Sequence, residues 1–320
     1  MARGNSSFSR LVTTTLQNHG KEIFDAVSNN NSLFYMLNKR GNIKLVGGGR
    51  TFTHPVYHLQ NSSFKSYAKL DTINTPIMDD ITRAEYDIKC VAGSLVLSTM
   101  EEAMNAGSKE GLIKLAKEVK EGAIISMRKV MGEQVWKTGV LANDMDGLPS
   151  LIEDTPGTST IGGIDSSDSS NTWWKAQVGS TVTNFDSSHD GTYQLNRLLT
   201  AATFGNEGPT ACFTTKANYS LYEQDLTGQI RYMKTELADS SFRHLAFATM
   251  PVLFDDNCPT NYFYMVDLNS IWLQLLSRGN FQTTPFQDSI NQLSKIAKMY
   301  VFGNLTAGSL RTSGQLQITG

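Results

Sequence analysis

The most constraining feature of this chain is a long amphipathic segment, SKEGLIKLAKEVKEGAIISMRKVMGEQVWKTG, at residues 108–139. Charged pairs of opposite sign at i,i+4 spacing, such as Glu110 with Lys114, follow one face. The pattern predicts a helix over 109–137, roughly 40 Å long at 1.5 Å per residue, which acts as a structural spine. Its apolar stripe, at spacings of three and four, consists of Leu112, Ala116, Val119, Ala123, Met127 and Val130.

The segments after this helix mix strand and helix patterns without regular alternation. Helical periodicity returns in TYQLNRLLTAATFG, and GPTACFTTKANYSLYEQDL is typical of a strand followed by a helix. We expect two or three strands within 245–276 and two more within 296–320. Because a doubly wound sheet needs alternating strands and helices, the predicted fold class is α+β.

Residues 1–44 resemble an arm more than a domain. Residues 1–50 contain seven Lys or Arg but only Glu22 and Asp25 as acids, so the arm is basic. Within NSLFYMLNKRG, Ser32 is a candidate N-cap and Gly41 a candidate helix stop. Two alternatives remain open: a solvated tail, or an arm that lies across an acidic surface.

Residues 45–90 form an excursion of extended segments with a polar tip near 61–80. NIKLV, TFTHPVYHL, SSFKSYAKL and ITRAEYDIKCVAGSLVLS all favour extended structure. Connections of this length without a core of their own tend to be functional. GGGRT, which starts at Gly47, lacks the spacing and the Lys of a phosphate loop, so we expect a hinge there.

Metal-site motifs fail on spacing. His54 and His58 would be ligands only on a helix, and on a strand they lie roughly 13 Å apart. ANDMDGLPSLIE places its acids at some positions of a calcium loop, but Ala142 occupies the first ligand position. A turn after the long helix is the better interpretation. We expect no metal and no cofactor.

Catalytic motifs are equally weak. The chain has five His and no GxSxG, and His189 in SSHDG is the one His beside Asp and several Ser. We therefore expect a protein that is not an enzyme. Net charge −2 argues against a dedicated nucleic-acid binder. The three cysteines are far apart and odd in number, which suits reduced thiols in the cytoplasm, and neither a signal peptide nor a membrane span is indicated.

Several separate motifs together resemble the major capsid proteins of tailed bacteriophages, which share the Hong Kong ninety-seven-type fold. They are GGGRTFTHPVYH, the long helix, GLPSLI, GGIDSSDSSNTWWKAQ, RYMKTELADSSF, MPVLFDDNCPTNYFYMVDLNSIWL and FGNLTAGSLRTSGQL. The resemblance runs from about residue 40 to the end. NTWWKAQ, PVLFDDNC and LTAGSLRTSGQL are its most specific parts.

The resemblance implies a domain plan. It makes 1–44 an N-terminal arm, 45–90 an extended loop that reaches over a neighbour, and 91–204 a peripheral domain with spine helix 109–137. Residues 205–285 become the axial domain, and 286–320 return to the peripheral domain.

The implied function is a structural subunit that assembles into hexamers and pentamers of an icosahedral head around double-stranded DNA. Implied partners are copies of itself, DNA bound without sequence specificity, and separate scaffolding, portal and decoration proteins, with no membrane. The extended loop begins near residue 45, so we expect any scaffold to be a separate protein. The virion capsid, made in the host cytoplasm, is the implied location.

Some members of this family cross-link their subunits through a Lys, an Asn and a carboxylate. Lys65 or Lys69 matches the first role and Asn304 the second. Because no Asp or Glu follows Asp288, the third role has no local candidate and we expect no cross-link.

Two adjacent tryptophans in a polar stretch, Trp173 and Trp174, need an explanation. On an extended segment their rings point to opposite faces, so we expect one in the core and one at a subunit contact; burial of both is the alternative. The candidates for subunit contacts are Arg50, Lys65, Lys69, Trp173 and Trp174. Two other functions stay open: an encapsulin-like cellular compartment shell and a hydrolase that uses His189.

Overall fold

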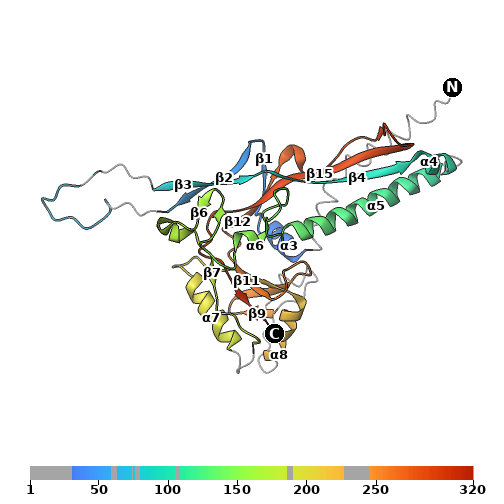
Figure 1. The fold of residues 1–320 in the computed structure, drawn as a ribbon. Coiled ribbons are helices and arrows are strands. Elements are labelled where there is room, and N and C mark those ends of the chain that lie inside the picture. Colours follow the sequence, from blue (N-terminus) through green and yellow to red (C-terminus); the bar gives the residue numbers. More distant parts are fainter. Residues whose placement is uncertain are drawn as a thin grey trace.

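A computed structural model describes residues 31–58, 63–73, 75, 80–105, 109–185, 190–226 and 245–319. The body contains two six-stranded sheets, and a hairpin and a long helix extend from it in opposite directions (Figure 1). Helices and strands do not alternate along either sheet, so the predicted α+β class is confirmed. No helix in the described part of the chain is long and apolar enough to cross a lipid bilayer.

The first sheet is organised on one long strand, β15 (Ser294–Ala307). β4 (Lys89–Ser98) pairs antiparallel with its first part, from Ser294 to Gly303. β12 pairs antiparallel with its last part, and β1 adds a parallel edge strand on β12. The remaining bounds are β1 (Ile43–Val46), β12 (Ile271–Leu276), β13 (Gln282–Thr283) and β14 (Gln287–Asp288), with a 3-10 helix at Ser277–Gly279.

The second sheet has the strand order β7-β16-β11-β8-β10-β9. The predicted helix of 192–205 and the predicted strand and helix of 208–226 are present as α7, β8 and α8. Residues 245–276 hold four strands instead of two or three, because Ala248 turns the chain with a positive φ of 52°. The bounds are β7 (Gln177–Val178), α7 (Gly191–Ala202), β8 (Ala211–Thr214), α8 (Lys216–Asp225), β9 (Leu245–Phe247), β10 (Met250–Phe254), β11 (Tyr262–Val266) and β16 (Gly314–Gln317).

The predicted long helix is α5 (Lys109–Gln134). It runs alongside β4, after the short α4 (Thr99–Asn105) has reversed the chain (Figure 1). It ends three residues before the expected Lys137, because the carbonyl of Val135 accepts a hydrogen bond from the backbone N–H of Leu148 at 2.8 Å. That bond begins α6 (Leu148–Leu151), so the interpretation of this stretch as a turn after the helix is correct.

The prediction that residues 1–44 form an arm is wrong for the last part of that segment. Residues 32–39 form α3 (Ser32–Lys39), and Leu33, Phe34 and Leu37 have no exposed surface. Asn31 caps the helix in place of the expected Ser32, whose backbone N–H and hydroxyl instead bond the buried carboxylate of Asp255 at 3.1 and 2.9 Å. α3 therefore belongs to the core of the body; residues 1–30 lie outside the described part.

The excursion is a hairpin of β2 (Thr51–Tyr57) and β3 (Ile81–Asp87), paired antiparallel in register from Thr51 with Asp87 to Tyr57 with Ile81. Its described tip, 63–73, contains no strand, so the expected extended structure of SSFKSYAKL is wrong there. Asp71 explains the difference, because its carboxylate accepts the backbone N–H of Ala68 at 2.7 Å and closes a turn.

Candidate assembly surfaces

The root of the hairpin is packed into the body by one face of each strand. On β2 the residues Phe52, His54 and Val56 alternate with exposed neighbours, and on β3 Ala84 and Tyr86 do the same. This period of two is what a half-buried strand requires. The hairpin is therefore anchored to the body through the inward faces of β2 and β3.

Backbone and side-chain hydrogen bonds reinforce this anchor. The hydroxyl of Tyr86 donates to the carbonyl of Ala307 at 3.0 Å, and the backbone N–H of Glu85 donates to Gly162 at 2.8 Å. The glycines 47–49, expected to be a hinge, thus connect two strands that are both fixed. This packing argues against a hinge at the base of the excursion.

His54 forms an aromatic joint between the hairpin and the first sheet. Its ring stacks on Trp272 with centroids 4.6 Å apart, and its Nε2 lies 2.8 Å from Thr306 Oγ1 and 2.6 Å from Gln274 Nε2. Burial, and secondarily the charge of Lys44, lower the pKa of His54 to about 4. His54 is thus a neutral packing residue, held by Trp272, Thr306 and Gln274.

The two tryptophans lie in a 3-10 helix (Ser169–Trp174), so the expectation of an extended segment is wrong. Trp174 has no exposed surface and donates its indole N–H to the carbonyl of Ile161 at 2.9 Å. Trp173 is half-buried, with its ring centroid 5.6 Å from that of Trp174 and 5.0 Å from that of His58. Trp174 is therefore a core residue, and Trp173 braces the hairpin where β2 leaves the body.

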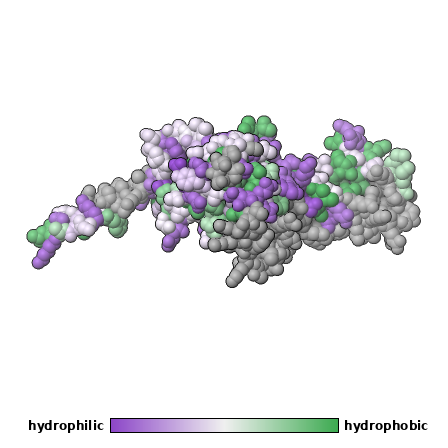
Figure 2. Space-filling model, turned by 90° about the horizontal axis from the view of Figure 1, so that it is seen from below, coloured by the Kyte–Doolittle hydropathy of each residue, from purple (hydrophilic) through white to green (hydrophobic). Residues whose placement is uncertain are grey.

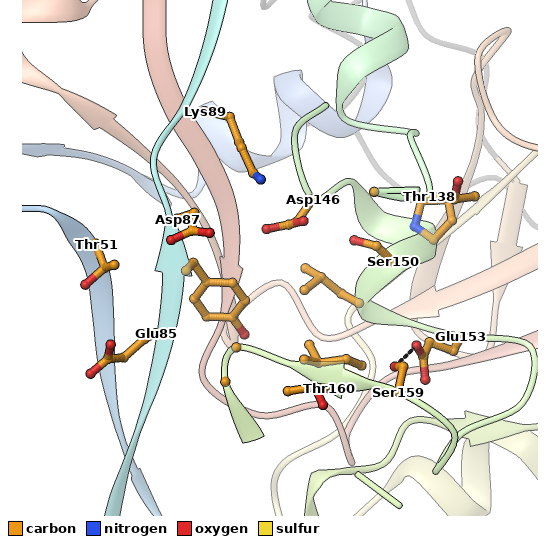
Figure 3. A pocket seen from close by; sticks show the side chains of 17 residues that line it. Thr51, Glu85, Asp87, Lys89, Thr138, Asp146, Ser150, Glu153, Ser159 and Thr160 are labelled. Carbon is orange, nitrogen blue, oxygen red and sulfur yellow. Dashed lines mark hydrogen bonds between the residues drawn. The ribbon is translucent and has the colours of Figure 1, made fainter. Parts of the chain in front are cut away.

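A cavity of about 570 Å³ opens beside the hairpin root, between β3, the segment after α5 together with α6, and a small hairpin of β5 (Thr160–Ile161) and β6 (Ile164–Asp165). Figure 3 shows Lys89, Asp87 and Asp146 at one side of it, and Glu153 with its partner Ser159 at the other. Glu153 and Asp146 are two of the acidic residues of ANDMDGLPSLIE, the stretch that resembles a calcium loop only in part. In the described residues, no group of three or more His, Cys, Asp or Glu is arranged to hold a metal ion.

Asn304 connects this region to β15. Its amide N–H group donates to Asp146 Oδ2 at 2.6 Å and to the carbonyl of Asp87 at 2.9 Å, while its oxygen accepts the backbone N–H of Asp146 at 2.8 Å. Its side chain has no exposed surface. Asp146 could not be associated with Asn304 from the sequence, because 158 positions separate them.

No family model matches the chain, and no curated protein matches its sequence. Solved structures do match. The capsid protein of cyanophage A-1(L) superposes with a TM-score of 0.67 at 12% identity, over 86% of this chain and 90% of that one. The capsid of a native GTA particle gives 0.57 at 12% identity, over 88% and 89% of the two chains.

The chain has the phage capsid fold. The Hong Kong ninety-seven-type architecture that the sequence motifs indicated is confirmed at the level of the fold. A third similar structure is the SrpI encapsulin of Synechococcus elongatus PCC 7942, with a TM-score of 0.52 at 11% identity over 86% of this chain and 84% of that one. The capsid fold is thus shared by phage heads and by a cellular shell protein.

On this capsid fold, the remaining contact candidates lie at the hairpin. Arg50 precedes β2 and is exposed, and Lys65 and Lys69 are exposed at the tip. Lys65 Nζ lies 5.5 Å from the ring centroid of Tyr67 in the same tip. Their contact with a neighbour, like that of Trp173, stays a prediction. His189 lies outside the described residues.

Large apolar side chains are exposed at both ends of the capsid fold, as Figure 2 shows. At the hairpin tip Phe64, Leu70 and Ile73 are 80%, 94% and 62% exposed. At the opposite end, around α4 and the turn before β15, the exposed residues are Met100, Met104, Ile290 and Leu293. Large exposed apolar patches mark contact surfaces, and sequence reasoning missed them because single apolar residues in loops carry no periodic pattern.

Proposed function

We propose that this protein is the structural subunit of a phage head, which assembles into hexamers and pentamers of an icosahedral shell around double-stranded DNA. The observation that carries the proposal is the capsid fold with a hairpin that projects from the body. A tip without a core of its own buries too little surface to offset its ordering entropy. Packing on adjacent copies supplies the missing contacts.

The proposed role is structural and not enzymatic. Net charge −2 fits a shell that encloses DNA without reading its sequence, because such a subunit needs no strongly basic face. We propose separate scaffolding, portal and decoration proteins as further partners. The proposed location is the virion capsid, after synthesis in the host cytoplasm.

A second candidate is an encapsulin-like compartment shell. The similarity to the SrpI encapsulin favours it, since the same fold there forms a shell of a different kind. The two candidates differ in what they enclose: DNA in a phage head, cargo protein in a compartment.

Expression of the full chain followed by electron microscopy tests both candidates. We expect rings, tubes or closed shells that sediment far faster than a 35.3 kDa monomer. A chain that stays monodisperse and monomeric at high concentration in several salts would contradict both. Particles from infected cells then distinguish them, because only a phage head contains nuclease-protected double-stranded DNA.

A further inference from the structure

Two adjacent segments of the chain run from one six-stranded sheet into the other. β11 of the second sheet continues through residues 267–270 into β12 of the first, and β15 returns through residues 308–313 to β16. β12 pairs antiparallel with β15, and β11 pairs antiparallel with β16. The two connections, which we call the inter-sheet crossover, therefore lie side by side between the two ladders.

One buried residue, Asp267, connects the two halves of the crossover. Within its own connection, its carboxylate accepts the backbone N–H of Asn269 at 3.0 Å and the hydroxyl of Ser270 at 2.8 Å. From the other connection, the hydroxyl of Thr312 donates to the same carboxylate at 2.9 Å. The backbone N–H of Asp267 in turn donates to Ser313 Oγ at 3.0 Å. Hydrogen bonds to Thr312 and Ser313 thus cross from one connection to the other at a single residue.

The backbone is closely packed on the first-sheet side of the crossover. The N–H of Gly308 donates to the carbonyl of Ser270 at 2.8 Å. A Cβ at position 308 would lie 2.8 Å from Cζ3 of Trp272, so only a glycine fits there without displacing that indole. Because His54 stacks on the same indole, the crossover is continuous with the anchor of the hairpin.

A buried carboxylate at this position does more than add to the core. Apolar side chains of both sheets, such as Leu273 of β12 and Tyr264 of β11, already share one core. Apolar contact is non-directional, so it holds the sheets together without fixing the angle between them. Hydrogen bonds are directional, and a buried charge is unfavourable unless its donors stay in place. Asp267 therefore favours one arrangement of the sheets over others with similar apolar burial.

We propose that Asp267, through Thr312 and Ser313, fixes the angle between the two sheets and thereby sets the curvature of the assembled shell. The first sheet runs beside α5 and the hairpin, whereas α7 and α8 pack on the second (Figure 1). Copies that touch through both parts meet at a rotation that depends on this angle, and a ring closes only at particular rotations. The effect on curvature rests on the proposed function as a shell subunit, whereas the fixed angle within one subunit does not.

A matched pair of hydroxyl deletions tests the role of the crossover. Thr312→Val and Ser270→Ala each remove one hydroxyl donor from the same oxygen, Asp267 Oδ2. Only the bond from Thr312 joins the two connections. We expect both variants to lower the melting temperature slightly, but only Thr312→Val to loosen the angle between the sheets. Thr312→Ser keeps the hydroxyl and should restore the wild-type behaviour.

Spin labels on the two sheets measure the spread of this angle. Lys298 on β15 and Lys216 at the start of α8 are exposed, and both are replaced by Cys in a Cys90→Ser background, which removes the exposed native thiol. Full-length chains labelled at both sites are diluted with unlabelled chains, so that the measured distances lie within one copy. A broader distance distribution in Thr312→Val but not in Ser270→Ala is expected. Equal distributions in the two variants overturn the role of Asp267.

Electron microscopy of assembled particles tests the effect on curvature. Thr312→Val should give a wider spread of particle diameters than the wild type, or open tubes, while Ser270→Ala should match the wild type. A broader distance distribution without a wider spread of diameters overturns the effect on curvature. Ser313→Ala removes the other bond between the connections and replaces Thr312→Val in both measurements if that variant does not fold. Failure of the wild type to assemble rejects the proposed function, whereas the distance measurement still tests the fixed angle.

Discussion

The imidazole of His54 lies almost parallel to the indole of Trp272, with ring centroids 4.6 Å apart and planes inclined by 18°. Lys44 Nζ lies 4.3 Å from the centroid of the same indole. Three elements, β1, β2 and β12, thus meet at one aromatic ring. The joint holds the hairpin root against the first sheet. Protonation of His54 would place a second positive charge beside that of Lys44, which is unfavourable.

This joint predicts a specific pH dependence. The pKa of His54 is about 4 in the folded subunit, below the ordinary value of 6.5, so the unfolded chain binds the extra proton between these two values. Stability contributed by neutral His54 is complete above pH 6.5, falls as the pH drops toward 4, and is constant below that. The slope is at most about 1.4 kcal/mol per pH unit.

Urea unfolding of the subunit between pH 3.5 and 7.5 measures this effect, with His54→Gln as the control. The difference in unfolding free energy between wild type and variant should narrow as the pH falls from 6.5 to 4. A difference that stays constant over this range would show that His54 titrates alike in both states.

The tryptophan pair predicts unequal costs of substitution. Trp174→Ala removes a fully buried ring and its hydrogen bond to Ile161, so we expect a loss of about 3–5 kcal/mol of stability. Trp173→Ala should cost the isolated subunit less, because its ring is only half-buried. Thermal unfolding of the two variants provides the comparison. Equal losses of stability would mean that both rings contribute equally to the core of the subunit.

Two truncations should separate the arm from the body. Deletion of residues 1–30 leaves every described contact in place, so the subunit should still fold and keep its near-ultraviolet circular dichroism. Deletion of residues 1–40 also removes Leu33, Phe34 and Leu37, which are fully buried, and should abolish folding. A folded subunit without residues 1–40 would mean that α3 contributes little to the core.

The burial of Asn304 predicts particles without covalent cross-links. The sequence near Asn304 offers no carboxylate, but in the folded chain the carboxylate of Asp146 lies beside it, so the expectation of no local carboxylate is wrong. However, its amide is fully buried and engaged by Asp146 and Asp87, out of reach of a lysine from another copy. Particles boiled in SDS should run as one band near 35.3 kDa, whereas a ladder of multimers would contradict this.

Asn304→Ala gives an independent check of the same relationship. The substitution leaves the Asp146 carboxylate without its buried donor, so we expect a loss of about 1–3 kcal/mol of subunit stability. The measurement is urea unfolding of the isolated subunit. An unchanged midpoint would show that solvent replaces the lost donor.

Local sequence patterns determined the individual elements of this protein. The spacing of apolar residues along α5 and the alternation along β2 and β3 predicted their type, because helix and strand each impose a fixed side-chain period. The resemblance of separate motifs indicated the capsid fold. These predictions of element type and fold required no knowledge of contacts between residues far apart in the sequence.

Only the tertiary structure decided which of those elements are buried and what they touch. α3 lies in the segment that the sequence predicts to be a basic arm, yet it belongs to the core, where Asp255, 223 positions away, accepts the N–H and hydroxyl of Ser32. Trp173 and Trp174 were ambiguous because their environment comes from Ile161 and His58, on other segments. Periodicity is a property of neighbours in sequence, whereas burial depends on partners that the chain brings together by folding.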